Sequence, residues 1–223
     1  MLIFKNYLIS LKTSLKNKCV IVFGATGKIG TKLTIKLAKE NVKLIVQGKS
    51  KEKLEKLDNK LKSIGKSATL IHLDVSNIQN YRNIGEVIYK RFKKIDFYFN
   101  AISEINKLTP ITHLNNEEWN RILEVNLNSK WRLLKQIEVL LGKSNNPAIY
   151  FFLHKSAIKN MAYYHAYSIA NSALKKLVEV YHEEKKRFNF YIKGVCEEGI
   201  LGLNDDDEDK KFCQLNAIIK EII

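Results

Sequence analysis

A glycine-rich segment near the start of the chain constrains the fold more strongly than any other feature. The apolar run at residues 19–23 leads directly into Gly24-Ala25-Thr26-Gly27-Lys28-Ile29-Gly30. A buried strand that turns through glycines into a helix can hold a dinucleotide pyrophosphate. The first glycine permits the tight turn, the second lets the backbone approach the phosphates, and the third lets helix and strand pack closely. The segment therefore predicts a dinucleotide site where the N–H groups at the start of that helix face an anion.

Strand and helix patterns alternate along the rest of the chain. Apolar runs typical of buried strands occupy residues 42–47, 68–73, 95–99, 148–153 and 190–195. Helical patterns occupy residues 50–64, 77–93, 116–141 and 161–186. This order predicts an α/β fold, a doubly wound (Rossmann-type) parallel sheet of about six strands with helices on both faces.

The length is sufficient for one large domain. With 223 residues and 45% apolar content, the chain can bury an ample core. Residues 1–16 precede the first strand, and we expect them to form an N-terminal extension packed on a single domain at 17–223. The acidic run 205–209 is expected to lead into a last helix that ends near Ile223.

The large positive net charge does not by itself identify the class of partner. The formal net charge is +15, but only five of the 38 basic residues are arginine, and the lysines are scattered. This pattern favours solvated lysines over a nucleic-acid-binding face, while an attraction for phosphorylated ligands stays open. We expect no membrane span, because no uncharged apolar stretch approaches about 18 residues. Cys19 and Cys196 fall in predicted buried strands, which favours a reducing, cytoplasmic location over a disulfide framework.

Further motifs follow the glycine segment in order. They are Asp74-Val75 after the third strand, Asn100-Ala101 after the fourth, Glu118-Trp119-Asn120 followed by Val125-Asn126-Leu127, and the run from Tyr167 to Leu174. Together these motifs resemble the short-chain dehydrogenase/reductase family over about residues 17–220. The resemblance implies a bound nicotinamide dinucleotide with Asp74 beside its adenine ring, and a homodimer formed through the two long helices. It also implies a shortened C-terminal region, since only about two dozen residues follow Gly199.

The catalytic tetrad of that family (Asn, Ser, Tyr and Lys) is only partly matched. The resemblance implies that Asn126 and Tyr167 take two of its positions, with Tyr167 exchanging a proton with the substrate oxygen. Asn171 stands in the lysine position, and the serine position falls at His154 or the residue before it, with Ser156 two positions late. His154 could donate a hydrogen bond to a substrate carbonyl, or could be an ordinary polar residue at a strand end. Asn126 could serve catalysis, or could bond the backbone at a helix irregularity.

The neutral Asn171 side chain cannot lower the pKa of Tyr167 by charge, as the family's lysine does. Lowering a phenol pKa by about 3 units from its usual value near 10 takes roughly 4 kcal/mol. Carbonyl reduction needs only a neutral phenol that donates, whereas alcohol oxidation needs a base. We therefore expect the missing lysine to slow carbonyl reduction less than alcohol oxidation. Lys175, one turn beyond Asn171, is an alternative source of positive charge.

Cofactor choice is predicted from the residues after the second strand. Relatives that prefer NAD place an acid there to bind the ribose hydroxyls, but this chain has Gln47-Gly48-Lys49-Ser50. Lys28 adds a cation at a helix N-terminus, which costs about 0.3–1 kcal/mol unless an anion offsets it. These features predict NADP(H) rather than NAD(H), with Lys28, Lys49 and Ser50 near the 2′-phosphate. The alternative is that these lysines are ordinary surface residues.

These predictions define one candidate site and two candidate functions. The expected cofactor contacts are Gly24, Thr26, Gly27, Lys28, Ile29, Gly30, Lys49, Ser50, Asp74, Val75, Asn100 and Ala101. The catalytic candidates are Tyr167, Asn126, His154, Asn171 and Ser156, and no metal ligands are expected. The first function is NADP(H)-dependent reduction of a small carbonyl substrate. The second is that of a catalytically inactive relative that binds a dinucleotide as a sensor, regulator or subunit.

Overall fold

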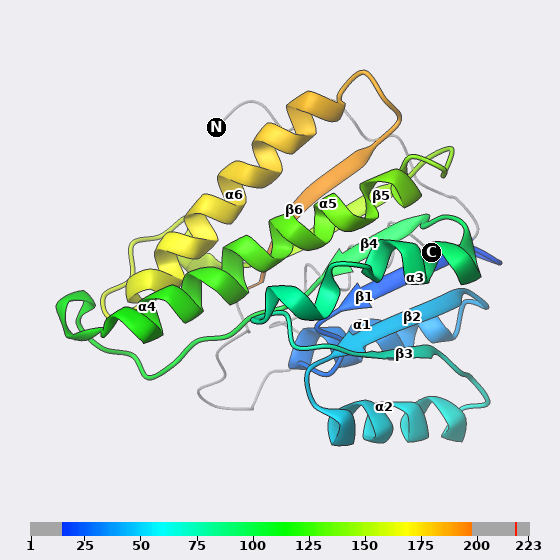
Figure 1. Cartoon of the computed structure of the whole chain (residues 1–223), viewed down its shortest axis with the longest axis horizontal. Helices are drawn as coiled ribbons and strands as arrows, with labels where there is room; N and C mark the ends of the chain where they lie inside the picture. The colour runs from blue at the N-terminus through cyan, green and yellow to red at the C-terminus, as the bar shows by residue number, and fades with distance from the viewer. Residues whose placement is uncertain (1–14, 198–216, 218–223) are drawn as a thin grey trace.

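Six parallel strands form one sheet at the centre of the molecule (Figure 1). The computed structural model describes residues 15–197 and residue 217. The strands are β1 (Cys19–Phe23), β2 (Lys43–Gly48), β3 (Thr69–His72), β4 (Phe97–Asn100), β5 (Ala148–His154) and β6 (Tyr191–Glu197). Their order across the sheet is β3-β2-β1-β4-β5-β6, and every pair is parallel. This arrangement confirms the predicted doubly wound fold, and the strand order reverses between β1 and β4.

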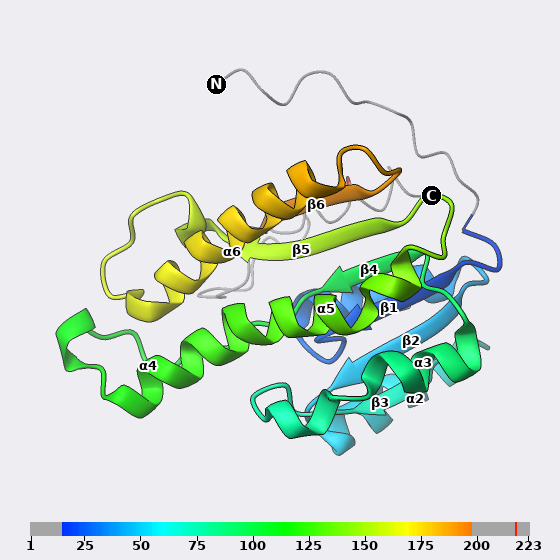
Figure 2. The same cartoon turned by 45° about the horizontal axis from the view of Figure 1, so that its top comes forward.

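Helices cover both faces of the sheet, because the central strands β1, β4 and β5 are buried along their whole length and need apolar partners on both sides. They are α1 (Lys28–Ala38), α2 (Lys51–Ser63), α3 (Ile84–Phe92), α4 (Asn116–Leu123), α5 (Ser129–Leu141) and α6 (His165–Lys185). Helices α1 and α2 pack on one face, and α3, α5 and α6 pack on the other (Figure 2). The predicted N-cap of α2 is confirmed, since the Ser50 hydroxyl accepts a hydrogen bond from the Lys53 N–H at 3.3 Å.

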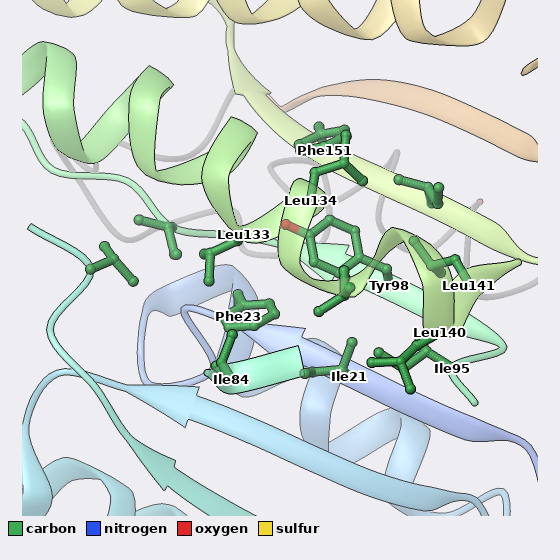
Figure 3. Packing of buried hydrophobic residues seen from close by; sticks show 14 of the residues in the cluster. Ile21, Phe23, Ile84, Ile95, Tyr98, Leu133, Leu134, Leu140, Leu141 and Phe151 are labelled. Carbon is green, nitrogen blue, oxygen red and sulfur yellow. The ribbon is translucent and has the colours of Figure 1, made fainter. Parts of the chain in front are cut away.

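Aromatic and branched side chains fill the larger of the two cores (Figure 3). Phe23, Tyr98 and Phe151 from neighbouring strands contact one another, with ring centroids 5.6 Å apart in both pairs. Leu133 and Leu140 of α5 belong to the same core. Fully burying a side chain of this size contributes about 1.5–3 kcal/mol. This packing holds the carboxyl ends of β1, β4 and β5 at one edge.

Three predicted helices differ from those observed. Residues 116–141 form α4, a π-helical turn at Glu124–Asn128 and then α5, because Asn126 bonds the backbone at that turn. Residues 77–93 begin as a 3₁₀ turn (Ile78–Tyr81), and α3 starts only at Ile84. The helix predicted from residue 161 starts at His165, since the positive φ of Tyr163 (68°) cannot continue a helix.

Some predictions fall outside the described residues. They concern most of the N-terminal extension, the acidic run 205–209, the last helix and the shortened C-terminal region. Within residues 15–197, no helix is long and apolar enough to cross a membrane.

Candidate functional site

The glycine segment forms a tight turn between β1 and α1. Gly24 adopts a φ of +75°, and a Cβ there would lie 2.7 Å from backbone atoms of Ala101 and Ile102. A Cβ on Gly30 would lie 2.1 Å from the Gly24 carbonyl oxygen, so α1 can approach the strand only because this residue has no side chain. The turn after β1 and the chain after β4 are therefore in direct backbone contact.

The first turn of α1 presents unpaired backbone N–H groups. Its N-cap is Gly27, which has no side chain to bond these N–H groups, and the first turn contains no acidic residue. Lys28 is exposed at this end, whereas the Ile29 side chain is buried in the core, so only the Ile29 backbone can face a ligand. Thr26 lies against Gly48, where a Cβ would meet the Thr26 methyl carbon at 2.8 Å. Such a helix end favours an anion.

Gln47 supports the turn and was missed by the sequence reasoning. It is 2% exposed. Its side-chain oxygen accepts from the Gly24 N–H at 2.9 Å, and its amide donates to the Leu73 carbonyl at 2.5 Å. A polar residue in a buried strand was the available signal, because such a group needs internal partners.

The other predicted cofactor residues line the same edge. Asp74 accepts two hydrogen bonds from Ser76, at 2.9 and 2.8 Å. Burial raises the pKa of the Asp74 carboxyl, but these bonds and the nearby charges of Lys49 and Arg121 outweigh it and lower the pKa overall. The Val75 side chain is buried.

Asn100 shapes the chain that leaves β4. Its side-chain amide donates to the Tyr98 hydroxyl at 2.6 Å, and its side-chain oxygen accepts from the Ile102 N–H at 3.2 Å. Both polar ends of this buried side chain are therefore used within the protein. Ala101 lies beside Gly24, and Asn100 pairs with Phe23 in the sheet and holds the backbone of Ile102.

Lys49 forms an ion pair within the candidate site. Its ammonium lies 2.7 Å from a carboxylate oxygen of Glu104. Arg121 of α4 binds the same carboxylate, with Nε 2.5 Å from one oxygen and Nη2 3.2 Å from the other. Burial raises the pKa of Glu104, but Arg121 and Lys49 outweigh this and hold it below its usual value. The sequence offered no signal for Glu104 or Arg121, because the pairing depends on how the chain turns after β4.

Asn126 clamps the backbone of Glu104 from the π-helical turn. Its side-chain oxygen accepts from the Glu104 N–H at 3.0 Å, and its amide donates to the Glu104 carbonyl at 2.7 Å. The same amide donates to the Ile122 carbonyl at 2.9 Å. Asn126 therefore bonds the backbone at a helix irregularity, as one of its two interpretations expects, and such turns are frequent at functional sites.

Tyr167 lies in the first turn of α6 and is only 1% exposed. Its hydroxyl is 2.8 Å from the Ser103 hydroxyl, and either group can be the donor. Burial raises the pKa of Tyr167, and hydrogen bonding with the Ser103 and Asn171 side chains offsets part of that rise. Tyr167 is therefore a neutral phenol at pH 7, able to donate a proton but poorly suited to remove one.

His154 ends β5 next to Tyr167. Their ring centroids are 5.4 Å apart, and the imidazole also stacks on Tyr164 at 5.2 Å. Burial, helped by the charge of Lys155, lowers the pKa of His154 to about 4, so the ring is neutral at pH 7. Since Nδ1 accepts from the Ser156 N–H at 3.2 Å, the ring proton is on Nε2.

Ser156 belongs to the same arrangement. Its hydroxyl lies 3.0 Å from His154 Nδ1, so the structure pairs it with the histidine and not with Tyr167.

Asn171, in the position of the family's lysine, has a structural role. Its side-chain oxygen accepts from the His154 N–H at 3.0 Å, and its amide donates to the Tyr167 carbonyl at 2.9 Å. The side chain thus ties the end of β5 to the start of α6. Lys175 does not replace the lysine, because it pairs with Glu179, one turn further from Tyr167. Among the described residues, no His, Cys, Asp or Glu side chains gather in a cluster that could hold a metal ion.

The chain is similar to known oxidoreductases. A family model described as short chain dehydrogenase matches residues 18–204. An uncharacterized oxidoreductase of Listeria innocua is 29% identical over 114 residues, which are 51% of this chain and 46% of that protein. A 3beta-hydroxysteroid dehydrogenase of Mediterraneibacter gnavus is 26% identical over 174 residues, covering 75% of this chain and 62% of that protein. The chain spans about half the length of several of the curated relatives it matches.

Solved structures share the fold. A metagenomic short-chain oxidoreductase in complex with NADP has a TM-score of 0.82 at 17% identity, covering 93% of this chain and 92% of that one. A short chain dehydrogenase of Shigella flexneri complexed with NADP has a TM-score of 0.79 at 19% identity, covering 87% and 86%. At this identity the likeness shows the fold alone.

Proposed function

Because the chain belongs to the short-chain dehydrogenase/reductase family, we propose that it binds NADP(H) and reduces a small carbonyl substrate. The observation that carries this proposal is the placement of Tyr167 and His154 at the same sheet edge as the glycine turn. The cofactor would supply the hydride. The residues of this chain would supply the anion site, the proton and the orientation of the substrate oxygen.

The glycine turn fits a dinucleotide. Gly24 and Gly30 keep side chains out of the turn, and the uncapped start of α1 favours a pyrophosphate. The absence of an acid after β2 and the presence of Lys49 and Lys28 favour a 2′-phosphate over ribose hydroxyls. The structural neighbours solved with NADP support the same choice.

Tyr167 would act as the proton donor. When the Ser103 hydroxyl donates to the Tyr167 oxygen, the phenolic proton is free to go to a substrate oxygen. The same bond stabilises negative charge on the phenol as the proton leaves. Ser103 would in this way replace part of what a lysine in the place of Asn171 would do. The neutral Nε2–H of His154 would take the serine's role of a hydrogen-bond donor to the substrate carbonyl.

The test is a titration with NADPH, followed by nicotinamide fluorescence, with NADH in parallel at the same salt concentration. We expect saturable binding that favours NADPH by at least about tenfold, since each tenfold step in affinity corresponds to about 1.4 kcal/mol. A screen of carbonyl substrates with NADPH then tests the chemistry. Equal affinity for the two cofactors would contradict the cofactor choice, and no binding at millimolar concentration would contradict the proposal as a whole.

A second candidate, an inactive dinucleotide-binding protein, is favoured by one specific observation. Asn171 bonds the backbone of His154 and Tyr167 and carries no charge, so it holds β5 against α6 without supplying the cation that the family's lysine supplies. Asn171→Lys separates the two functions. A gain in carbonyl reduction would indicate a site that lacks only the lysine. No gain in a variant that stays folded and binds cofactor would favour the inactive protein.

The outer faces of α5 and α6 support a homodimer. Between them lies a groove of about 390 Å³, lined by Trp131, Leu134, Leu177, Val180 and Tyr181 together with charged residues. Trp131 and Val180 are each about half exposed. Covering such apolar surface is favourable. We expect sedimentation to show a dimer, and a stable tetramer would contradict it. Cys19 is buried in β1 and, within the described part of the chain, forms no disulfide, which supports the proposed cytoplasmic location.

A further inference from the structure

Three charged residues form a cluster at the carboxyl ends of the strands, here called the Glu104 cluster. Lys49 follows β2, Glu104 follows β4 and Arg121 belongs to α4. The Glu104 carboxylate receives Lys49 at 2.7 Å and both Nε and Nη2 of Arg121, at 2.5 and 3.2 Å. The side chain of Glu104 is 19% exposed, so this pairing is partly shielded from water. Two-atom pairing with an arginine is the strong, oriented form of an ion pair.

The Glu104 cluster lies over the candidate cofactor site. Strands β2 and β4 are the two neighbours of β1, which leads into the glycine turn. The pair between Lys49 and Glu104 therefore bridges the two strands on either side of that turn. The chain just before Glu104 is in contact with Gly24, where a Cβ would lie 2.7 Å from Ala101. This is the point where the strand order reverses, and open α/β sheets bind ligands at such a point.

The position of Glu104 is set by its backbone and not by its partners alone. Asn126 holds both the N–H and the carbonyl of Glu104, at 3.0 and 2.7 Å. The carboxylate can therefore leave Lys49 and Arg121 by rotating its side chain while the chain stays in place. A group that competes for the two cations does not need to unfold the loop.

We propose that Glu104 occupies a phosphate site, and that the 2′-phosphate of the cofactor displaces its carboxylate from Lys49 and Arg121. This inference rests on the proposed function and adds Glu104 and Arg121 as residues that determine cofactor specificity. A phosphate matches the two-pronged geometry of arginine as well as a carboxylate does, and it carries more charge. A ribose hydroxyl is neutral and cannot displace the carboxylate. The exchange thus admits a 2′-phosphorylated dinucleotide and disfavours one without it.

The experiment titrates the full chain with adenosine 2′,5′-bisphosphate and, separately, with ADP. The variant is Glu104→Gln, which keeps the shape of the side chain and removes its charge. Its matched control is Glu117→Gln, an exposed acid of the same helix as Arg121 that makes the same change in net charge. We expect Glu104→Gln to bind the bisphosphate about tenfold more tightly than the wild type, because the cost of displacing the carboxylate is removed. Affinity for ADP should change by less than about threefold, and the control should change neither.

A second variant keeps the test decisive. Arg121→Gln leaves Glu104 in place and should weaken the bisphosphate by about tenfold while sparing ADP. If Glu104→Gln and Glu117→Gln bind the bisphosphate equally, the inference is overturned. Preferential binding of NADPH by the wild type would in that case still support the proposed function. If neither wild type nor Glu104→Gln binds any of the nucleotides, both the inference and the proposed cofactor are overturned.

Discussion

The two halves of the candidate site, at the carboxyl ends of the strands, present different chemical groups. The glycine-loop half comprises β1 to β3 with α1 and α2, and the tyrosine half comprises β4 to β6 with α4 to α6. The first presents backbone, namely the turn at Gly24 and the open start of α1. The second presents side chains, and Tyr167, His154 and Asn171 are each tied to other groups of the protein.

The difference shows which part of such a site tolerates sequence change. A site built from backbone N–H groups requires only that the turn keep its shape, and a few glycines are enough. Catalysis by side chains requires particular groups with particular pKa values, so replacing one residue changes the chemistry. The glycine-loop half has the glycine turn and the open helix end on which the proposed dinucleotide site depends, whereas the tyrosine half has a neutral amide at Asn171 and a serine bonded to its phenol.

Tyr167→Phe tests whether the tyrosine half still performs chemistry. Removing the hydroxyl should lower the rate of carbonyl reduction about 10²–10⁴-fold, the usual contribution of a positioned acid. NADPH affinity should stay within about twofold, since the glycine-loop half is untouched. Steady-state kinetics and cofactor titration measure the two effects. Tyr163→Phe, at an exposed residue nearby, is the control, and an unchanged rate in Tyr167→Phe would remove this half from the mechanism.

Gly30→Ala tests how rigid the glycine-loop half is. The added Cβ would lie 2.1 Å from the Gly24 oxygen, so α1 must move away from the strand. We expect the free energy of unfolding to fall by about 3 kcal/mol in urea denaturation. Gly65→Ala is the control for backbone strain without a close contact, because its φ is positive (+68°), unlike that of Gly30, and its Cβ would meet nothing within 4 Å. That control should lose about 1–2 kcal/mol, and equal losses would contradict the close-packing argument.

The buried Lys130 tests the half that contains α5 through its effect on the free energy of unfolding. It lies on α5, is 1% exposed, and burial lowers its pKa from 10.5 to about 7. The folded state therefore binds this proton less tightly than the unfolded chain does. Stability should rise as the pH increases from about 7 to about 10.5.

Lys130→Met should raise the free energy of unfolding by about 2 kcal/mol at pH 7 and lose most of that gain near pH 10. Lys60→Met, at an exposed lysine of α2, should change stability by less than about 0.5 kcal/mol. Similar changes for both variants would refute a cost of burial at Lys130.

His154 makes the tyrosine half sensitive to acid. Its pKa in the folded state is lowered to about 4, below the unfolded value of 6.5, so folding disfavours its protonation. Its contribution to the free energy of unfolding is fully present above about pH 6.5 and is lost as the pH falls toward 4. We expect this loss to be about 1–2 kcal/mol. His154→Gln should flatten the stability profile between these pH values, whereas His113→Gln, at an exposed histidine, should not.

Much of the glycine-loop half could be predicted from the sequence. β1 begins and ends where the apolar run does, β2 and β3 start one residue later than predicted, and Ser50 caps α2. These features follow from local preferences, such as apolar runs, an N-cap and glycines at a tight turn. Gln47 was missed although it carries the turn, because its partners at Gly24 and Leu73 are far away in the sequence.

The tyrosine half could be predicted only in part. The structure brings Tyr167 and His154, two of the predicted catalytic candidates, into contact. The helix over residues 116–141 was predicted as one element, with an irregularity at Asn126 as one of two interpretations of that residue, and the structure has a π-helical turn there. At that turn the Asn126 side chain also binds the backbone of Glu104, which lies on another segment. A helical pattern in the sequence carries no information about such a partner.

The sequence by itself determined the sheet, its layers and the glycine turn, because each depends on contacts between near neighbours or on a periodic apolar pattern. The tertiary structure alone decided which side chains are free at the site. Ser103 reaches Tyr167 and Glu104 reaches Lys49 across 64 and 55 residues of chain. These pairings depend on the path of the loop after β4, and that path is set by the Asn126 clamp and by the close approach to Gly24.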